Sequence, residues 1–481
     1  MNSLFHEQCY ANGKWFSSQK GRVTHVFNPY DQNLIGSIPT LEKDEITKVI
    51  NDAHAAFNPW KSKTAKERSA ILLKWYELIL SSQDTLAQLL TQEQGKSITE
   101  ARAEIQYGAS FIQWFAEEAK RAYGDIIPQT VPNQRLLVIK QALGVVAAIT
   151  PWNFPVAMIT RKCAPALAAG CPVIIKPSSL TPFSALALAD LAQQAGIPKG
   201  VFNIVTGEAA LIAKLFCENP LVKKISFTGS TLVGQQLAEE AAKHFKKVSL
   251  ELGGNAPFIV FNDANLDEAV EGAILAKFRN SGQTCVCANR FLLQKEIAKP
   301  FTKKFIEKIK ALPIGNGLNE TTRITTLINE AAIQKLEALL KDATKKGAKL
   351  LLGGNPASQG RYFFEPTVLV DVTSKMDITR QEIFGPIVAI SEFNTIDEAL
   401  ALANNTEFGL AAYFYSKNIE TIFKVAENLE YGIVGVNSGI ISNEVSPFGG
   451  IKHSGTGREG SKYGLDEYLE IKYICLGELN L

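Results

Sequence analysis

Short apolar runs alternate with longer amphipathic stretches from about residue 143 of the chain. The short runs are rich in Val and Ile, as buried strands are, and the longer ones repeat apolar residues at helical spacing. Strands are expected at 145–149, 173–176, 201–205, 225–227 and 248–252, and helices at 156–169, 184–195, 209–217 and 232–243. Because strands that alternate with helices form a parallel sheet covered on both faces, we predict a Rossmann-like nucleotide-binding domain.

A second series of the same kind follows Gly253 and Gly254. Helices are expected there at 265–279, 297–311, 328–346, 396–404 and 419–429, and strands at 290–294, 366–370, 411–415 and 432–436. Upstream of both series, amphipathic helices that can pack around the first sheet are expected at 43–57, 64–80, 83–94 and 97–120. The pattern therefore predicts an α/β protein with two sheet-based domains.

Two segments, 123–141 and 467–477, have strand-like patterns but belong to neither series. Exposed strands need pairing partners, and pairing between subunits can supply them, so we expect a homo-oligomer, either a dimer or a tetramer. The predicted division of the chain is 1–122 with 142–253 for the nucleotide domain, 254–450 for the second α/β domain, and 123–141 with 462–481 for oligomerisation.

Composition and charge exclude several classes of protein. The 481 residues carry 50 Lys and Arg against 48 Asp and Glu, and this net charge of +2 offers no basic excess for nucleic acid. No run approaches the ~18 apolar residues of a membrane span, and the first residues lack the features of a signal peptide. The 7 cysteines form no Cys-x-x-Cys pair and the 5 histidines are scattered, so no metal site is expected. We expect a cytoplasmic protein that binds neither nucleic acid nor membrane.

A candidate nucleophile, Cys285, ends a Gly-containing loop just before an expected strand. A thiol in such a place can be exposed, although a cysteine of this kind taken alone is more often buried and inert. No histidine lies in a motif that would pair with it, but Glu251 ends an apolar strand and precedes Gly253 and Gly254. A carboxylate there can act as a base, and a salt-bridged strand end is the other interpretation.

Several motifs are specific in combination. They are Thr150-Pro151-Trp152-Asn153-Phe154-Pro155, Phe227-Thr228-Gly229-Ser230, Val248-Ser249-Leu250-Glu251-Leu252-Gly253-Gly254-Asn255, Gly282-Gln283-Thr284-Cys285 and Glu382-Ile383-Phe384-Gly385-Pro386. With them the chain resembles the aldehyde dehydrogenase superfamily over nearly its whole length, from Phe27 to Glu459. The resemblance implies the aldehyde dehydrogenase fold, with a Rossmann-like cofactor domain, an α/β catalytic domain and a small β oligomerisation element.

The same resemblance implies that Cys285 is the nucleophile, that Glu251 is the general base, and that the Asn153 amide and the Cys285 backbone N–H form an oxyanion hole. These roles are chemically reasonable, because a thiol of pKa ~8.5 needs a base and a developing oxyanion needs fixed donors. Attack on an aldehyde gives a thiohemiacetal, loss of hydride to a nicotinamide gives a thioester, and hydrolysis gives a carboxylic acid. The other interpretation of Asn153 is that it caps the helix at 156–169.

Residues for a nicotinamide cofactor follow from the resemblance as well. Gly229 and Ser230 follow a strand and open a helix, where a pyrophosphate can rest, although a simple Ser N-cap is the plainer interpretation. Ser179 stands where many NAD-preferring relatives carry Glu, and Ser does not repel a 2′-phosphate, so NADP is expected and NAD is the second choice. The resemblance assigns the remaining cofactor contacts to Trp152, Lys176, Gly234, Glu382 and Phe384.

Two arginines indicate the class of aldehyde. Arg161 lies within the helix at 156–169, which is nearly apolar all round, and Arg279 precedes the Cys285 loop. A structural carboxylate partner is the default for each, but two guanidinium groups beside one thiol suit an aldehyde with a remote carboxylate. Further motifs are Met158-Ile159-Thr160-Arg161-Lys162, Phe278-Arg279-Asn280, Cys285-Val286-Cys287-Ala288-Asn289-Arg290, Ile441-Ser442-Asn443-Glu444-Val445 and Gly460-Ser461-Lys462-Tyr463-Gly464. With these motifs the resemblance narrows to the succinate-semialdehyde dehydrogenases, in which the equivalents of Arg161, Arg279 and Ser442 hold the substrate carboxylate. We therefore expect oxidation of succinate semialdehyde to succinate in 4-aminobutyrate degradation.

Some alternatives stay open. Glutarate semialdehyde is the nearest alternative substrate, since one methylene is worth only about 1–3 kcal/mol of discrimination, and a broader aldehyde specificity is another. Cys287 follows Cys285 by two residues. In relatives with this spacing the pair can form a reversible disulfide that silences the enzyme, and a buried inert Cys287 is equally compatible with the sequence. A redox sensor or a structural protein without turnover is the non-enzymatic alternative.

Overall fold

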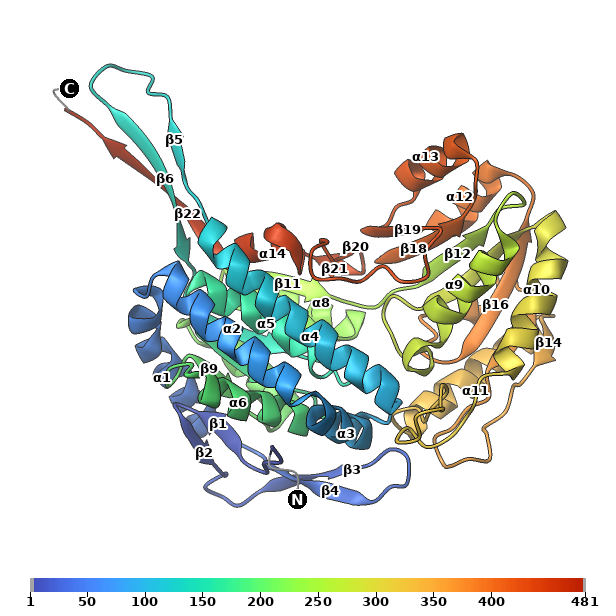
Figure 1. Cartoon of the computed structure of the whole chain (residues 1–481), viewed down its shortest axis with the longest axis horizontal. Coiled ribbons are helices and arrows are strands. Elements are labelled where there is room, and N and C mark those ends of the chain that lie inside the picture. Colours follow the sequence, from blue (N-terminus) through green and yellow to red (C-terminus); the bar gives the residue numbers. More distant parts are fainter. Residues whose placement is uncertain (1–3, 479–481) are drawn as a thin grey trace.

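The computed structural model describes residues 4–478 of the chain. Residues 1–3 and 479–481, which the predicted nucleotide and oligomerisation domains include, lie outside the described residues. Figure 1 shows two α/β bodies side by side and a narrow three-stranded arm that projects from the first body.

The first body is built on an eight-stranded sheet in the order β2-β1-β9-β8-β7-β10-β11-β21. Its central strands are parallel, namely β9 (Phe202–Ile204), β8 (Val173–Lys176), β7 (Val145–Ile149), β10 (Val222–Thr228) and β11 (Lys247–Glu251). The antiparallel pair β1 (Cys9–Ala11) and β2 (Lys14–Phe16) extends one edge, and β21 (Gly455–Thr456) extends the other. The sheet thus includes residues 455–456, which the ranges predicted for the nucleotide domain leave out.

Helices cover both faces of this sheet. Successive strand residues point to opposite sides, and in β7 both sets of residues are apolar, so each face packs against helices. Val146 and Ala148 of β7 pack in the core shared with α5 (Ala157–Ala169) and α6 (Phe183–Ala195). Val145 and Ala147 pack in the core shared with α1 (Lys43–Lys61) and α7 (Ala209–Glu218), and α8 (Thr231–Ala242) covers β10 and β11. A further layer lies over α5 and α6 (Figure 1) and consists of α2 (Ala65–Ser81), α3 (Gln83–Gln94) and α4 (Ile98–Glu118).

The second body has a seven-stranded sheet, parallel except at one edge. Its strands in order are β14 (Lys349–Leu352), β15 (Thr367–Val370), β16 (Ile387–Phe393), β13 (Ala288–Gln294), β12 (Ala256–Val260), β18 (Ala411–Tyr415) and β19 (Ile433–Val436), with β14 antiparallel. The helices of this body are α9 (Leu266–Phe278), α10 (Lys295–Lys310), α11 (Glu330–Lys345), α12 (Ile396–Asn404) and α13 (Ile419–Asn428).

The arm joins the two strand-like segments that belong to neither series. β5 (Asp125–Ile127) and β22 (Leu469–Leu476) flank β6 (Arg135–Ala142), and all three are antiparallel (Figure 1). The smaller elements are β3 (Val23–Phe27) with β4 (Leu34–Pro39), β17 (Phe408–Gly409) with β20 (Ile451–Lys452), α14 (Ser461–Asp466), and the 3₁₀ turns η1 (Ala119–Arg121), η2 (Arg279–Gly282) and η3 (Asp377–Thr379).

The helices and strands agree closely with the pattern of apolar residues. α3, α12 and β18 have the predicted bounds. α1 continues four residues beyond 57 to Lys61 and so contains Pro59, which lacks the N–H that would donate a hydrogen bond in the last turn. The edge strands β1 to β4 were not predicted, since strands of a few half-exposed residues carry little periodicity, and β12 was missed because it contains Pro257.

No helix in residues 4–478 is both long enough and apolar enough to cross a membrane. Within the same residues, no group of three or more His, Cys, Asp or Glu side chains is arranged to hold a metal ion.

Candidate active site

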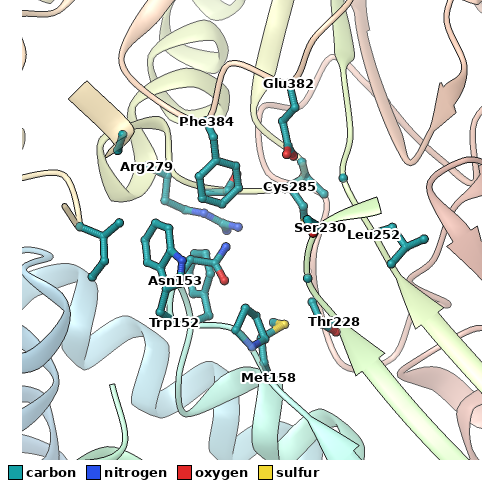
Figure 2. A pocket seen from close by; sticks show the side chains of 18 of the residues that line it. Trp152, Asn153, Met158, Thr228, Ser230, Leu252, Arg279, Cys285, Glu382 and Phe384 are labelled. Atoms are coloured by element: carbon teal, nitrogen blue, oxygen red, sulfur yellow. The ribbon is translucent and has the colours of Figure 1, made fainter. Parts of the chain in front are cut away.

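A cavity of about 370 Å³ lies where loops of both bodies meet. This volume suits a small-molecule site. Figure 2 shows that the loop after β7, the turn after β10, and the loops around Cys285 and Glu382 supply its walls. The cavity gathers most of the residues predicted for the site, namely Trp152, Asn153, Arg161, Gly229, Ser230, Arg279, Cys285, Glu382, Phe384 and Ser442.

Cys285 lies in the loop between η2 and β13, and its half-buried side chain lines the cavity (Figure 2). Burial raises the pKa of its thiol to about 12, although the positive charges of Arg161 and Arg279 lower it. The resting thiol is therefore protonated at neutral pH and requires a base, or donors that favour the thiolate, before it can attack.

Asn153 lies in the loop between β7 and α5, with its amide on the cavity (Figure 2). Its Nδ2 atom donates a hydrogen bond to the Gln283 carbonyl at 3.2 Å. The amide N–H groups at the start of α5 are satisfied by Glu104, whose Oε1 accepts from Val156 at 2.9 Å and from Ala157 at 3.2 Å. Because Glu104 takes these bonds, Asn153 does not cap the helix and its amide is available to the cavity.

Glu251 is the last residue of β11 and is 2% exposed. Neither carboxylate oxygen has a hydrogen-bond partner among the described residues, so the salt-bridged strand end is not what the structure contains. Burial and the neighbouring Glu459 raise its pKa well above the ordinary value. The side chain does not line the cavity, although Leu252 and Gly253, the next two residues, do.

The turn after β10 has the features of a phosphate site. Ser230 holds the N-cap position of α8, but its side chain makes no capping hydrogen bond, so the simple N-cap interpretation fails. Gly234 lies on α8 where it packs against β11, and a Cβ atom there would be 2.3 Å from Cδ2 of Leu252. A side chain at Gly234 would press α8 away from the strand.

Glu382 faces the same cavity from the second body. Its Oε1 atom accepts a hydrogen bond from the Gly254 N–H at 3.0 Å. Burial raises the pKa of Glu382 to about 7, while this hydrogen bond and the charge of Lys335 oppose the rise. The rings of Phe384 and Trp152 meet edge to face, with centroids 5.5 Å apart (Figure 2).

Lys176 and Ser179 lie outside this cavity. Lys176 ends β8 opposite Ile149 of the neighbouring β7, so it stands at the same carboxyl edge of the sheet as the Asn153 loop. It is 6% exposed, and burial lowers its pKa. Ser179 is half-buried in the loop before α6.

The two arginines have different surroundings. Arg161 is 1% exposed on α5, and its Nε atom lies 2.6 Å from a carboxylate oxygen of Glu459. Its guanidinium also lies over the Phe448 ring, and Nη2 has no partner among the described residues. Arg279 is half-buried and lies over the Phe154 ring at 5.1 Å, and it forms no ion pair within residues 4–478. The default partner carboxylate is therefore present for Arg161, whereas no carboxylate of the described residues forms an ion pair with Arg279.

Cys287 is 2% exposed and does not line the cavity. Its Sγ atom lies 3.4 Å from the Nζ atom of buried Lys277. Burial raises the pKa of Cys287 and lowers that of Lys277, which favours a neutral pair.

Several wall residues were given no role from the sequence, and these are Tyr107, Phe154, Lys335 and Phe448. Glu459 was also missed as a functional neighbour, although the family resemblance extends to it, and it binds both Arg161 and Lys162. Tyr107 and Lys335 lie on helices, where they look like ordinary core or surface positions, whereas Phe154 stands within a motif quoted above and so carried a usable signal.

Comparison with known proteins agrees with this geometry. The model of the Aldehyde dehydrogenase family matches residues 15–474. The chain belongs to the aldehyde dehydrogenase family. It is 55% identical over 476 residues to the succinate-semialdehyde dehydrogenase (NADP(+)) of Escherichia coli (strain K12), covering 99% of each chain. It is also 55% identical over 473 residues to the glutarate-semialdehyde dehydrogenase of Pseudomonas putida, covering 98% of each.

A solved structure described as an E. coli NADP dependent enzyme superimposes on this aldehyde dehydrogenase with a TM-score of 0.98, at 55% identity and 99% coverage of both chains. The predicted aldehyde dehydrogenase fold is confirmed, as is membership of an oxidoreductase family. Equal identity to relatives named for two different semialdehydes means that overall similarity does not select the substrate, so the site must do so.

Proposed function

We propose that this aldehyde dehydrogenase oxidises succinate semialdehyde to succinate, as in 4-aminobutyrate degradation, with NADP as the preferred hydride acceptor and NAD as the second choice. The observation that carries the proposal is the Arg279 guanidinium, which lines the cavity of Cys285 without an ion pair among the described residues. A partly buried cation without a counter-ion favours an anionic group on the substrate. Ser442 and Arg161 line the same cavity and complete the proposed carboxylate site, and the Nη2 atom of Arg161 has no hydrogen-bond partner among the described residues.

The reaction that we propose begins when Cys285 loses its proton and its sulfur attacks the aldehyde carbon. The oxyanion that forms accepts hydrogen bonds from Nδ2 of Asn153 and from the Cys285 backbone N–H. A nicotinamide cofactor, when bound, would supply the hydride acceptor, and loss of hydride from the tetrahedral adduct would leave a thioester on Cys285. Water then attacks the thioester, and the cleaved C–S bond releases the acid and the thiol.

Glu251 is the proposed base for the water. Its carboxyl group must first turn from its buried position toward the cavity, which its neighbours Leu252 and Gly253 already line. Burial raises the pKa of Glu251, so exposure to the cavity favours the carboxylate that takes the proton from water. The same rotation takes the carboxyl group of Glu251 out of a buried position in which it has no hydrogen-bond partner among the described residues.

The cofactor residues that we propose are Gly229 and Ser230 at the pyrophosphate, Lys176 and Ser179 at the adenosine ribose, and Glu382 at the nicotinamide ribose. Trp152 and Phe384 pack beside the nicotinamide, and Gly234 allows α8 to approach the sheet. Support comes from the uncapped start of α8, where backbone N–H groups and the helix dipole favour an anion. The relative from E. coli named for NADP(+) supports NADP.

We also propose a cytoplasmic homo-oligomer, a dimer or a tetramer. The exposed apolar side chains of the arm support assembly, and Ile126 and Ile471 are 80% and 72% exposed. All seven cysteines are free thiols, which suits a reducing compartment.

For Cys287 we propose the redox role that the sequence suggested, a reversible disulfide with Cys285. Formation of this disulfide requires Cys287 to leave the Nζ atom of Lys277. Mild peroxide should abolish turnover, a reductant should restore it, and Cys287→Ala should prevent the reversible part of the loss. Unchanged activity after peroxide, or the same reversible loss in Cys287→Ala, would instead indicate that Cys287 is inert.

The substrate assignment is tested by kinetics with succinate semialdehyde, glutarate semialdehyde and propanal. Because charge-assisted hydrogen bonds contribute about 1.5–3 kcal/mol, Arg279→Gln should lower kcat/KM for succinate semialdehyde roughly 10- to 100-fold and leave propanal nearly unchanged. Arg380→Gln, at an exposed arginine, is the matched control. If wild type oxidised propanal equally well, or if Arg279→Gln impaired all substrates alike, the carboxylate site would be wrong. A higher kcat/KM for glutarate semialdehyde would favour the second substrate, and no turnover at all would favour a sensor or structural protein.

A further inference from the structure

The N-terminal end of α4 holds two buried charged residues, Lys96 and Glu104, and a half-buried one, Glu100, that the proposed reaction does not use. Lys96 lies just before the helix, and Glu100 and Glu104 lie in its first two turns. The side chains of Lys96 and Glu104 have no exposed surface, and their charged atoms are 2.5 Å apart. A buried ion pair of this kind seldom stabilises a fold more than apolar residues of the same size would. Stability of the fold therefore does not explain why this ion pair is buried here.

Lys96 and Glu104 together hold the segment that carries Asn153. The Nζ atom of Lys96 donates a hydrogen bond to the Asn153 carbonyl at 2.8 Å, and it lies 4.0 Å from the centroid of the Phe154 ring. Glu104 uses one oxygen for Lys96 and the other for the backbone N–H groups of Val156 and Ala157. The backbone that follows the Asn153 side chain, from its own carbonyl to Ala157, is thus bonded to α4 and to Lys96 just before it.

Glu100 holds the loop that leads to Cys285. Its Oε1 atom accepts a hydrogen bond from the Asn280 N–H at 2.7 Å. The Nδ2 atom of Asn280 donates to the Asn153 carbonyl at 3.0 Å and to the Gln283 carbonyl at 3.2 Å. Since Nδ2 of Asn153 also donates to the Gln283 carbonyl, the two loops are joined directly and both are tied to one helix.

We propose that Lys96, Glu104 and Glu100 are positioning residues that set the Asn153 amide relative to Cys285. The helix fixes the two loops, one from each body, against each other through charge-assisted hydrogen bonds, which are short and directional. The oxyanion donor then needs no rearrangement when the tetrahedral adduct forms. This inference rests on the proposed role of Asn153 in the oxyanion hole.

The test compares Lys96→Met and Glu104→Gln with Asn153→Ala, using the full-length enzyme and succinate semialdehyde. Misplacement of a catalytic group by about 1 Å can cost ~10²-fold, so kcat should fall by that order while KM for aldehyde and for NADP stays within about threefold. Because Lys96 acts through Asn153, the double variant Lys96→Met/Asn153→Ala should be no slower than Asn153→Ala alone. Arg102→Gln, on the same helix but in exposed ion pairs with Asp84 and Glu320, should keep wild-type kcat.

Glu104→Gln keeps an acceptor for the start of α5 and Glu100→Gln touches only the other loop, so these variants serve if Lys96→Met does not fold. Alkylation of Cys285 by iodoacetamide should proceed at the wild-type rate in each folded variant, which separates a misplaced amide from a damaged thiol. If Asn153→Ala kept wild-type kcat, the proposed oxyanion role would fail first. If Asn153→Ala were slow while the folded Lys96 and Glu104 variants were not, or if the losses in the double variant multiplied, the positioning role alone would be wrong.

Discussion

Asn153 and Glu251 are polar residues whose immediate neighbours limit what they can do. Glu104 bonds the first amides of α5, which leaves the Asn153 side chain for the cavity. Glu251 has no bond partner within the described residues and lies near Glu459, which is itself held in the charged form because Lys162 and Arg161 lower its pKa against the effect of burial. The result is one carboxyl group that favours its proton beside another that favours its charge.

This difference predicts a pH-dependent effect of Glu251→Gln on stability. The pKa of Glu251 is raised in the folded chain by burial and by Glu459, so above the ordinary value of 4.5 the folded state binds more protons than the unfolded state. The contribution of Glu251 to stability is then present at low pH and is lost as pH rises, at up to about 1.4 kcal/mol per pH unit. The Tm of Glu251→Gln minus that of wild type should increase from pH 5 to pH 8.

Differential scanning fluorimetry across this pH range measures the effect, and Glu239→Gln at an exposed position of α8 is the control. A Tm difference that is flat or that decreases with pH would contradict the buried, protonated state of Glu251.

The neutral side chain of Ser179 predicts a preference for NADP over NAD. A carboxylate there would repel a 2′-phosphate, so Ser179→Glu should lower kcat/KM with NADP by about tenfold or more, equivalent to ~1.4 kcal/mol, and should leave the value with NAD unchanged or higher. Leu180→Glu places the same charge one residue further along, at an exposed position, and should alter the NADP to NAD ratio far less. If the two variants had equal effects, or if Ser179→Glu had none, the proposed contact between Ser179 and the cofactor would be wrong.

The loops that carry Cys285 and Glu382 can lie where they do because backbone segments approach each other closely at two glycines. Gly254 follows β11 and donates its N–H to Glu382, and a Cβ atom at Gly254 would stand 2.3 Å from the Cys285 carbonyl oxygen. A Cβ atom at Gly282 would likewise stand 2.3 Å from the Gly385 carbonyl oxygen, and Gly282 has a φ of +80°. Glycines at these two positions allow the cysteine loop to pack against β11 on one side and the Glu382 loop on the other.

Gly254→Ala should therefore disturb two groups at once. The added methyl group clashes with backbone that cannot rotate away, and overpacking of this kind costs about 1–3 kcal/mol. We expect kcat/KM to fall at least ~10-fold and KM for NADP to rise, because both Cys285 and Glu382 must move. Gly315→Ala, where a Cβ would meet only Oγ1 of Thr322 at 3.6 Å, should leave the steady-state kinetics and Tm unchanged. Wild-type kinetics in Gly254→Ala would show that these loops tolerate displacement.

For the whole molecule, the two bodies supply different groups to one cavity and the arm lies apart from it (Figure 1). Asn153 and Ser230 come from the first sheet, and Cys285 and Glu382 come from loops of the second body. The outer strands of the arm, β5 and β22, expose Ile126 and Ile471 to solvent. Apolar edge strands of this kind favour association between copies of the chain.

The arm predicts a measurable assembly. Light scattering after size-exclusion chromatography should give a mass above the 52.5 kDa of one chain. Ile126→Lys/Ile471→Lys should shift the mass to a smaller species, because burial of two lysines in an interface is unfavourable. Leu318→Lys, at an exposed leucine of the second body, should leave the mass unchanged. A monomeric wild type would refute the oligomer, and an unchanged mass in the double variant would place the interface elsewhere.

Along this chain, periodicity alone determined the two α/β series and most helix bounds, because burial of an apolar face leaves the same pattern wherever the helix lies. The motifs around Cys285 and Asn153 likewise indicated the family and the reacting groups. Only the tertiary structure decided that Arg161 pairs with Glu459 while Arg279 has no ion pair among the described residues, and that Glu251 is buried without lining the cavity. The link from Lys96 and Glu104 to Asn153 was also invisible in the sequence, since it joins residues more than 40 positions apart. Ion pairs and rotamers depend on which groups the fold brings within a few ångströms, and no local pattern encodes that distance.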